Sequence, residues 1–270
     1  MQLGNHADFK LSITKALGDQ LAEELEKLTP APLTETNIRL LPPTKGVYQL
    51  RRGSKLLYVG KAEVTLSQRL GKHLRKLSGR EGIRLEEITF TALSVDEDFS
   101  AVAPEKLLIN RFQGAGEAPW NENGFGINDP GDKRDTTVFA DNHFDQLYPA
   151  RLDWIIDGLP LGTQNLRTLL KIAKDALPYT FRYAYYRKAK ENIYEQFEVE
   201  ISKPQMTAGD FFQFVSGSLP EPWQIMALPG YVVMYPRELR SESARHYYVA
   251  GEMVLAEDMS GGADSPPVST

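Results

Sequence analysis

The chain has 270 residues, 41% of them hydrophobic and 25% charged, so it can form one large core or two modest ones. The absence of cysteine excludes disulfides and cysteine-ligated zinc, and the net charge of -5 argues against nonspecific coating of nucleic acid. No apolar run is long enough to span a membrane, and the first residues lack a signal-peptide pattern. We therefore expect a cytoplasmic protein with no membrane partner.

The first half of the chain has the pattern of a small α/β unit. In chain order, the sequence predicts an amphipathic helix at 11–28, a β-hairpin at 46–62, a helix at 64–79, a strand at 85–95, a helix at 100–112 and a long glycine-rich loop at 114–135. That loop is too long for a passive connector, which favours a functional role, although a plain connecting loop is the alternative.

Beyond residue 150 the pattern changes to a second α+β portion. We predict helices at 164–177 and 208–217, and strands within 179–186, 196–202, 224–236 and 245–258. The predicted organisation is an N-terminal helical arm (1–40), an α/β domain that includes the long loop (41–160), a C-terminal α+β portion of unknown role (161–256) and a disordered tail (257–270). The predicted fold class is α/β (α+β), with a small three-stranded antiparallel sheet flanked by helices.

A basic run lies in this acidic chain. Between residues 69 and 84 the positive side chains are Arg69, Lys72, Arg75, Lys76, Arg80 and Arg84, and Glu81 is the single acid. The run favours a face directed at a polyanion. A solvated helix face is the alternative.

The hairpin "GVYQLRRGSKLLYVGKA" carries a tyrosine near a glycine in each strand, Tyr48 after Gly46 and Tyr58 before Gly60. Glycine weakens a strand, so its presence in both strands indicates close approach of neighbouring groups. We expect both tyrosines on one functional face.

Three further polar residues follow at informative positions. Arg69 and His73 are four residues apart on the predicted helix, so they share one face beside its leucine stripe. Glu105 falls on the apolar face of the next helix, where a carboxylate needs a cation or a metal; a local salt bridge, for example with Arg69, is the alternative. Asn121 follows a rigid Pro–Trp pair and is either a turn residue or an orienting group.

These motifs together resemble the GIY-YIG nuclease superfamily. "GVY…YVG", "QRLGKH", a helical glutamate and "PWN" occur in the order of that superfamily, over roughly residues 40–130, with valine in place of each isoleucine. "PWN" followed by "GFG" and "NDPG" is most similar to its type II restriction endonucleases, which include enzymes that cut GC-rich palindromes such as CCGCGG. The spacing from Glu105 to Asn121 is stretched by "GAGE".

The resemblance implies Mg²⁺-dependent hydrolysis of double-stranded DNA, with Mn²⁺ as a possible substitute. A single carboxylate favours a one-metal scheme in which Glu105 holds the ion and Arg69 binds the phosphate. Tyr48 is the candidate general base, with Lys61 as the cation that lowers the pKa of its phenol, and His73 is the rival base. Tyr58 would position water or phosphate, and Asn121 would maintain the geometry.

We expect DNA contacts from the basic helix and from the long loop. The candidates are Lys72, Arg75, Lys76, Asn123, Asn128, Lys133 and Arg134. A palindromic site predicts a homodimer, because protein symmetry mirrors site symmetry. The competing hypotheses are a repair or homing nuclease of the same superfamily, and a non-catalytic DNA-binding protein on this fold.

Overall fold

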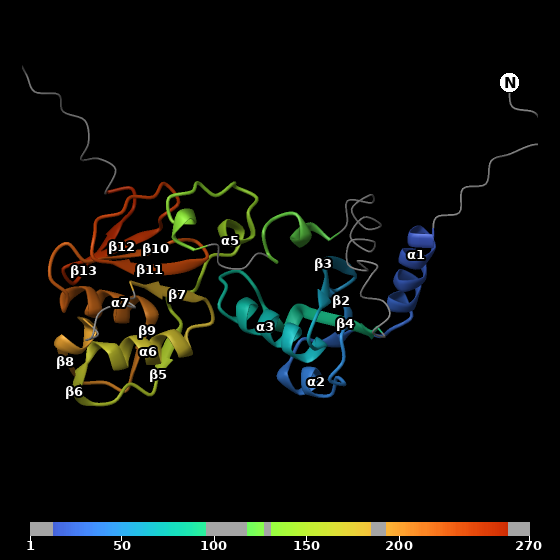
Figure 1. Ribbon diagram of the computed structural model, residues 1–270, viewed down its shortest axis with the longest axis horizontal. Helices are drawn as coiled ribbons and strands as arrows, with labels where there is room; N and C mark the ends of the chain where they lie inside the picture. Colours follow the sequence, from blue (N-terminus) through green and yellow to red (C-terminus); the bar gives the residue numbers. More distant parts are fainter. Residues whose placement is uncertain (1–12, 96–117, 127–130, 185–192, 259–270) are drawn as a thin grey trace, which may run out of the picture. The chain divides into compact units, whose positions relative to one another are not determined.

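The computed structural model describes residues 13–95, 118–126, 131–184 and 193–258, with side chains in the first helix described from residue 16 (Figure 1). The chain is mixed α+β and divides into two compact units. Unit 1 comprises residues 1–74 and 84–126, and unit 2 comprises 75–83 and 127–270. Within the described residues, no helix has the length and apolar character needed to cross a membrane.

Unit 1 is built on an antiparallel sheet with strand order β1-β4-β2-β3, of which β2, β3 and β4 are labelled in Figure 1. Its strands are β1 (Ala31–Pro32), β2 (Gly46–Arg52), β3 (Lys55–Ala62) and β4 (Ile88–Ser94). The three expected strands are present, and the two-residue β1 adds a fourth at the edge beside β4.

The β2–β3 hairpin turns at Gly53, whose φ of 57° is in the left-handed region that glycine adopts without strain. A register shift between Leu50 and Arg51 adds a bulge to the pair.

Helices cover the sheet of unit 1. Helix α1 (Ile13–Glu26) packs Leu21 and Leu25 against Val47 and Val59, so this helix belongs to the core of unit 1 and is not a separate arm. Helix α3 (Leu66–Ser78) begins where Thr65 accepts a hydrogen bond from the amide of Gln68. The other helical segments among the described residues of unit 1 are α2 (Glu35–Arg39), η1 (Leu85–Glu87) and η3 (Pro119–Asn121).

Unit 2 contains a five-stranded sheet in the order β13-β12-β10-β11-β7 (Figure 1). These strands are β7 (Thr180–Tyr183), β10 (Gln224–Ala227), β11 (Tyr231–Tyr235), β12 (His246–Val249) and β13 (Glu252–Leu255). The two long stretches expected near 224–236 and 245–258 are therefore each an antiparallel hairpin. The described residues of this unit also form two smaller pairs, β5 (Ile155–Asp157) with β9 (Gln205–Thr207) and β6 (Gly162–Asn165) with β8 (Glu198–Ile201).

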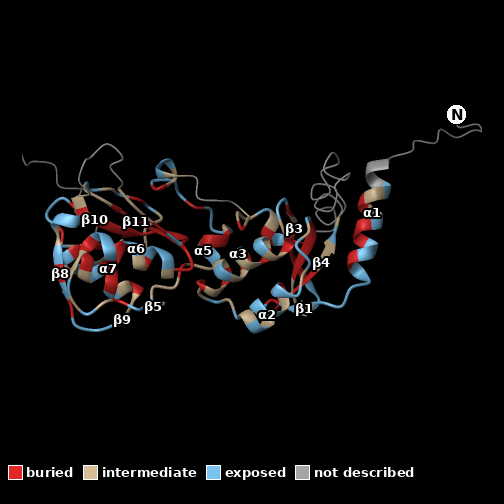
Figure 2. Cartoon of the chain, turned by 60° about the horizontal axis from the view of Figure 1, so that its bottom comes forward, coloured by how far each residue is buried: buried red, intermediate tan, exposed pale blue. Residues whose placement is uncertain are grey.

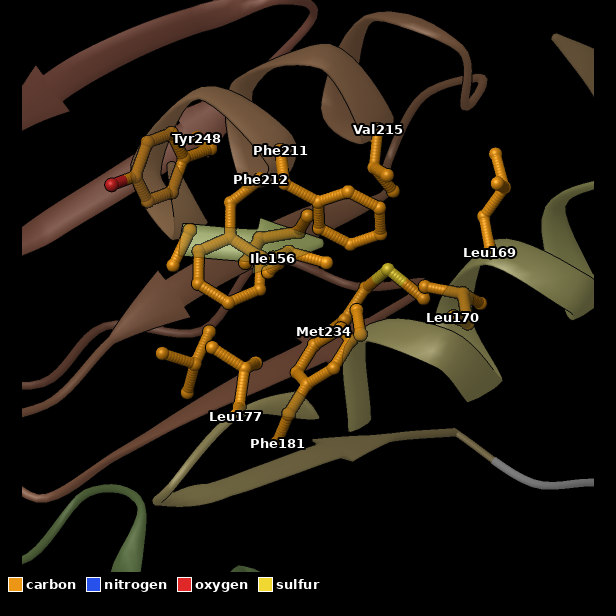
Figure 3. Packing of buried hydrophobic residues seen from close by; sticks show 14 of the residues in the cluster. Ile156, Leu169, Leu170, Leu177, Phe181, Phe211, Phe212, Val215, Met234 and Tyr248 are labelled. Atoms are coloured by element: carbon orange, nitrogen blue, oxygen red, sulfur yellow. The ribbon is translucent and has the colours of Figure 1, made fainter. Parts of the chain in front are cut away.

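Helices α6 (Leu166–Ala176) and α7 (Ala208–Gly217) bury their apolar faces in the core of unit 2. Figure 3 shows Phe211 and Phe212 of α7 and Leu170 of α6 around Met234 of β11. In Figure 2 both helices carry buried residues on one side and exposed residues on the other. The short segments of this unit are η4 (Asp132–Arg134), α5 (Phe144–Leu147) and η5 (Ile193–Gln196).

The boundary between the units differs from the expected one at residue 160. Residues 127–160 belong to unit 2 because Phe139 packs with Met226 and Tyr231, and because β5 pairs with β9. The expected helix at 100–112 and the tail lie outside the described residues, apart from the first two positions of the tail.

Candidate active site

Tyr48, Tyr58 and Gly60 lie on one face of the β2–β3 hairpin. Tyr48 pairs with Gly60 and Leu50 pairs with Tyr58, so the alternation of side chains places both phenols on the same side. The two ring centroids are 6.1 Å apart. A Cβ atom on Gly60 would lie 2.3 Å from Tyr48 Oη and 2.7 Å from Tyr58 Cε1. Glycine at position 60 therefore makes room for both rings.

Gly46 has the role expected for close backbone approach. A Cβ atom at this position would lie 2.1 Å from the carbonyl oxygen of Leu93 on β4. The two glycines of the motif thus allow different close contacts. Gly46 lies against strand β4, and Gly60 lies against the phenol of Tyr48.

Helix α3 contributes two side chains that meet the hydroxyl of Tyr48. Arg69 Nε donates a hydrogen bond to Tyr48 Oη at 3.1 Å, and Oη lies 2.6 Å from His73 Nε2. The i, i+4 spacing places Arg69 and His73 on the same side of α3, as expected. Arg69 donates to Oη, and the hydroxyl hydrogen of Tyr48 can in turn be donated to Nε2 when the ring proton of a neutral His73 is on Nδ1.

The three residues differ in exposure. Tyr48 is fully buried and His73 is 4% exposed, whereas the Arg69 side chain is half-buried and is the outermost group of the three. Burial acts to lower the pKa of Arg69, but the hydroxyl groups of Tyr48 and Tyr58 outweigh it, so its pKa is raised. The guanidinium therefore stays charged beside the phenol.

The side chain of Asn121 links residues 118–126 to strand β3. The amide of Val59 donates to Asn121 Oδ1 at 2.9 Å, and Asn121 Nδ2 donates to the carbonyl of Val59 at 2.8 Å. This double hydrogen bond attaches residues 118–126 beside Tyr58.

Phe125 packs on the same cluster and was missed by the sequence analysis. Its ring stacks on His73 at 4.8 Å with an interplanar angle of 23°, and it meets Tyr58 edge-on at 4.9 Å. Trp120 packs on Phe125 at 4.9 Å, and a Cβ atom on Gly126 would lie 2.8 Å from Tyr58 Oη. The signal in the sequence is an aromatic residue between two glycines, "GFG".

Lys61 does not lie beside the Tyr48 hydroxyl. It pairs with Val47, whose side chain packs toward α1, so Lys61 leaves the sheet on the face opposite to Tyr48. Its Nζ lies 3.9 Å from Glu63 Oε1. The predicted coupling of Lys61 to the pKa of Tyr48 is therefore wrong, and the cation next to this phenol is Arg69.

The basic run does not form one face. Lys72 is exposed, but Arg75 Nη2 donates to the carbonyls of Asp175 and Leu177 at 2.5 and 2.8 Å, which is a structural role at the end of α6. Arg80 is buried against Asp145 at 3.0 Å, and Arg84 pairs with Glu87.

The other expected DNA contacts occupy varied environments. Lys76 Nζ lies over the ring of Phe144, and Arg134 contacts His143. Lys133 is exposed, and Asn123 is half-buried. Asn128 lies outside the described residues.

Glu105 also lies outside the described residues. In the part of the chain that the structure describes, there is no group of three or more His, Asp or Glu residues that could hold a metal ion. The described site consists of two phenols, a guanidinium and an imidazole.

Comparison of the chain with protein-family models and with curated proteins found no match.

Proposed function

We propose that the protein is a sequence-specific endonuclease of double-stranded DNA, of the type II restriction kind found in the GIY-YIG superfamily. The hydrogen-bonded chain from Arg69 through Tyr48 to His73 is the observation that carries this proposal. It joins three residue types suited to phosphodiester hydrolysis, and all three are supplied by the motifs that resemble the superfamily.

Arg69 is the group that would bind the scissile phosphate. Its Nε is used by Tyr48, but its planar fork presents further N–H donors at the exposed end of the side chain. Charge that develops on the phosphoryl oxygens would be stabilised by this fixed cation, which is already held in place before substrate arrives.

Tyr48 and His73 would act as one unit in activating water. Tyr48 Oη takes the proton of the attacking water while its own hydroxyl proton passes to His73 Nε2, 2.6 Å away. Arg69 stabilises negative charge on the phenolic oxygen during this transfer. Tyr58 and Phe125 restrict the position of the imidazole, because both rings contact it.

Glu105 would hold a Mg²⁺ ion, for which Mn²⁺ could substitute. When bound, the ion supplies charge neutralisation at the phosphate and at the leaving 3′-oxygen.

The proposal extends to a GC-rich palindromic site, cut by a homodimer in the cytoplasm. The exposed Lys72 and Lys133 remain candidates for DNA contact. Arg75 does not, because its guanidinium serves the carbonyls at the end of α6.

The test is cleavage of supercoiled plasmids that carry or lack CCGCGG, with Mg²⁺ or with excess chelator. We expect discrete double-strand cuts that need the metal and that Arg69→Ala abolishes. Arg39→Ala is the matched control, because Arg39 is an exposed arginine of unit 1 that pairs with Glu35. Metal-independent cutting, or full activity of Arg69→Ala, would contradict the proposed mechanism.

The alternative is a non-catalytic DNA-binding protein on this fold. The complete burial of Tyr48 favours it, since a buried polar network can also serve to specify a core. Plasmid binding without cleavage under every metal condition would select this alternative.

A further inference from the structure

Strand β13 is the last strand of the five-stranded sheet of unit 2, and β12 is its neighbour (Figure 1). Among the described residues, no other strand pairs with β13, so one side of it presents backbone groups that no sheet partner uses. The strand also carries two exposed apolar side chains, since Met253 and Leu255 are 50% and 46% exposed. An unpaired strand edge with apolar side chains favours pairing with another strand.

The β12–β13 hairpin determines which backbone groups lie on this free side. Its loop is the two-residue segment Ala250–Gly251, and both residues have positive φ, as in a tight hairpin turn. Such a loop makes Val249 and Glu252 the hydrogen-bonded pair that closes the turn. Because hydrogen-bonded and non-hydrogen-bonded pairs alternate along an antiparallel ladder, the amide and carbonyl of Met253 point away from β12.

The same alternation continues to the end of the strand. The amide of Ala256 donates to the carbonyl of Arg245, just before β12, at 3.3 Å, so Leu255 also points its amide and carbonyl outward. The Leu255 carbonyl accepts the amide of Asp258 at 3.1 Å and retains a second lone pair. The free side of β13 thus offers two amides and two carbonyls, on Met253 and Leu255.

The spacing of these groups is self-complementary. If two copies of the chain meet around a two-fold axis at Val254, Met253 of each copy lies opposite Leu255 of the other, and both pairs exchange two hydrogen bonds. The four apolar side chains then share one face of the joined sheets, because the two positions are two residues apart. An axis at Met253 would instead place Gly251 of the hairpin turn opposite Leu255.

Charge also favours the axis at Val254. The chain is acidic, with a net charge of -5, and acidic residues flank the strand at both ends. A shift of the axis to Leu255 would place Glu252 opposite Asp258, which adds a repulsive pair. With the axis at Val254, Glu252 lies opposite Ala256, and no acidic side chain lies directly opposite another.

We propose that β13 is a dimerisation edge, at which two copies of this chain join their five-stranded sheets around a two-fold axis at Val254. The proposed function expects a homodimer but assigns it no interface, and this inference rests on the geometry of β13, not on nuclease activity. The paired segment is short, so the interface belongs to the small class, below about 1,200 Å² of buried area. The dimer should therefore dissociate reversibly on dilution.

The first experiment tests the register with single cysteines, because the chain has none of its own. Residue 254 would lie opposite its own copy in a non-hydrogen-bonded pair, with Cα atoms about 4.5 Å apart, which a disulfide can bridge. Val254→Cys, oxidised with glutathione disulfide, should therefore run as a covalent dimer of the full chain on a non-reducing gel.

Glu252→Cys is the matched control for this experiment. Glu252 is the more exposed of the two positions, but its copies would be more than about 10 Å apart along the strands. The control should therefore stay monomeric on the gel. Equal cross-linking of the two variants, or none in Val254→Cys, overturns the register and the proposal with it.

The second experiment measures association without cysteine, by sedimentation equilibrium of the full chain up to about 1 mM, where even a weak complex is populated. Wild type should show a reversible monomer–dimer equilibrium. Met253→Lys places a charge on both sides of the contact and should raise the dissociation constant of the dimer about tenfold or more. Leu161→Lys, at an exposed leucine of unit 2 outside β13, should leave it unchanged.

Two results of the sedimentation experiment overturn the interface. One is a wild-type chain that stays monomeric at every concentration, and the other is a Met253→Lys dimer as tight as that of wild type. Neither experiment contains DNA or Mg²⁺ or measures cleavage, so failure of the nuclease proposal and failure of this interface are distinguishable.

Discussion

The phenol of Tyr48 lies against the backbone of Gly60, its cross-strand partner in the β2–β3 hairpin. The contact is so close that position 60 has no space for a methyl group beneath the hydroxyl. The same hydroxyl meets Arg69 and His73 on its other side. Gly60 therefore determines where the Tyr48 hydroxyl lies in the candidate site.

The first prediction concerns Gly60→Ala. A Cβ atom 2.3 Å from Tyr48 Oη must displace the phenol, so we expect a loss of about 1–3 kcal/mol in the free energy of unfolding, together with loss of cleavage. Urea denaturation measures the first effect. Gly71→Ala is the control, because a Cβ atom there meets nothing within 4 Å and alanine favours a helix. Equal stability of Gly60→Ala and wild type would contradict this account.

The second prediction concerns Phe125→Leu. Leucine keeps the position apolar but removes the stack on His73, so we expect the cleavage rate to fall. The loss of stability should be about 1 kcal/mol. Phe212→Leu, in the core of unit 2, should lower the free energy of unfolding, measured by urea denaturation, without changing the cleavage rate. A wild-type rate in Phe125→Leu would show that the ring is only a packing element.

Much of unit 1 follows from local pattern. The hairpin, helix α3 and β4 have strong periodicity, and the spacing of Arg69 and His73 placed both residues on the side that meets Tyr48. The contact of the Asn121 amide with both backbone groups of Val59, by contrast, is visible only in the structure.

The features that could not be predicted from the sequence depend on tertiary contacts. Lys61 adjoins the motif in sequence, but strand alternation places it on the opposite face from Tyr48. Glycine-rich composition favoured an open recognition loop, whereas Phe125 is buried at 1% exposure. Arg75 has the charge of a DNA contact, and only the fold brings it to the carbonyls of Asp175 and Leu177.

The third prediction is that unit 2 loses stability at acid pH. Burial lowers the pKa of His246, and Arg245 lowers it further, so the folded state favours the neutral ring. The unfolded chain, with a pKa of about 6.5, binds the proton more readily. The neutral His246 ring therefore contributes to the free energy of unfolding above about pH 6.5, and this contribution is lost as the pH falls through the pKa that His246 has in the folded state. The free energy of unfolding should fall less between neutral and acid pH in His246→Gln than in the wild type; an unchanged slope would exclude His246 as a source.

The fourth prediction is that Lys61→Met leaves the pH dependence of cleavage unchanged. Lys61 lies on the opposite sheet face and near Glu63, so it does not influence the phenol of Tyr48. Single-turnover rates across pH measure this. An upward shift of the optimum in Lys61→Met would instead restore the lysine as the activating cation.

The last prediction treats Tyr48 and His73 as one proton-transfer unit. Tyr48→Phe keeps the ring but removes the hydroxyl that joins Arg69 to His73, so single-turnover cleavage should fall by about 10²–10⁴-fold. His73→Ala should cost a similar factor, and the double variant should be no slower than the slower single variant, because both act on the same proton. Additive losses would mean that the two residues serve separate steps. A near-normal rate in Tyr48→Phe, with His73 essential, would assign the base to the imidazole alone.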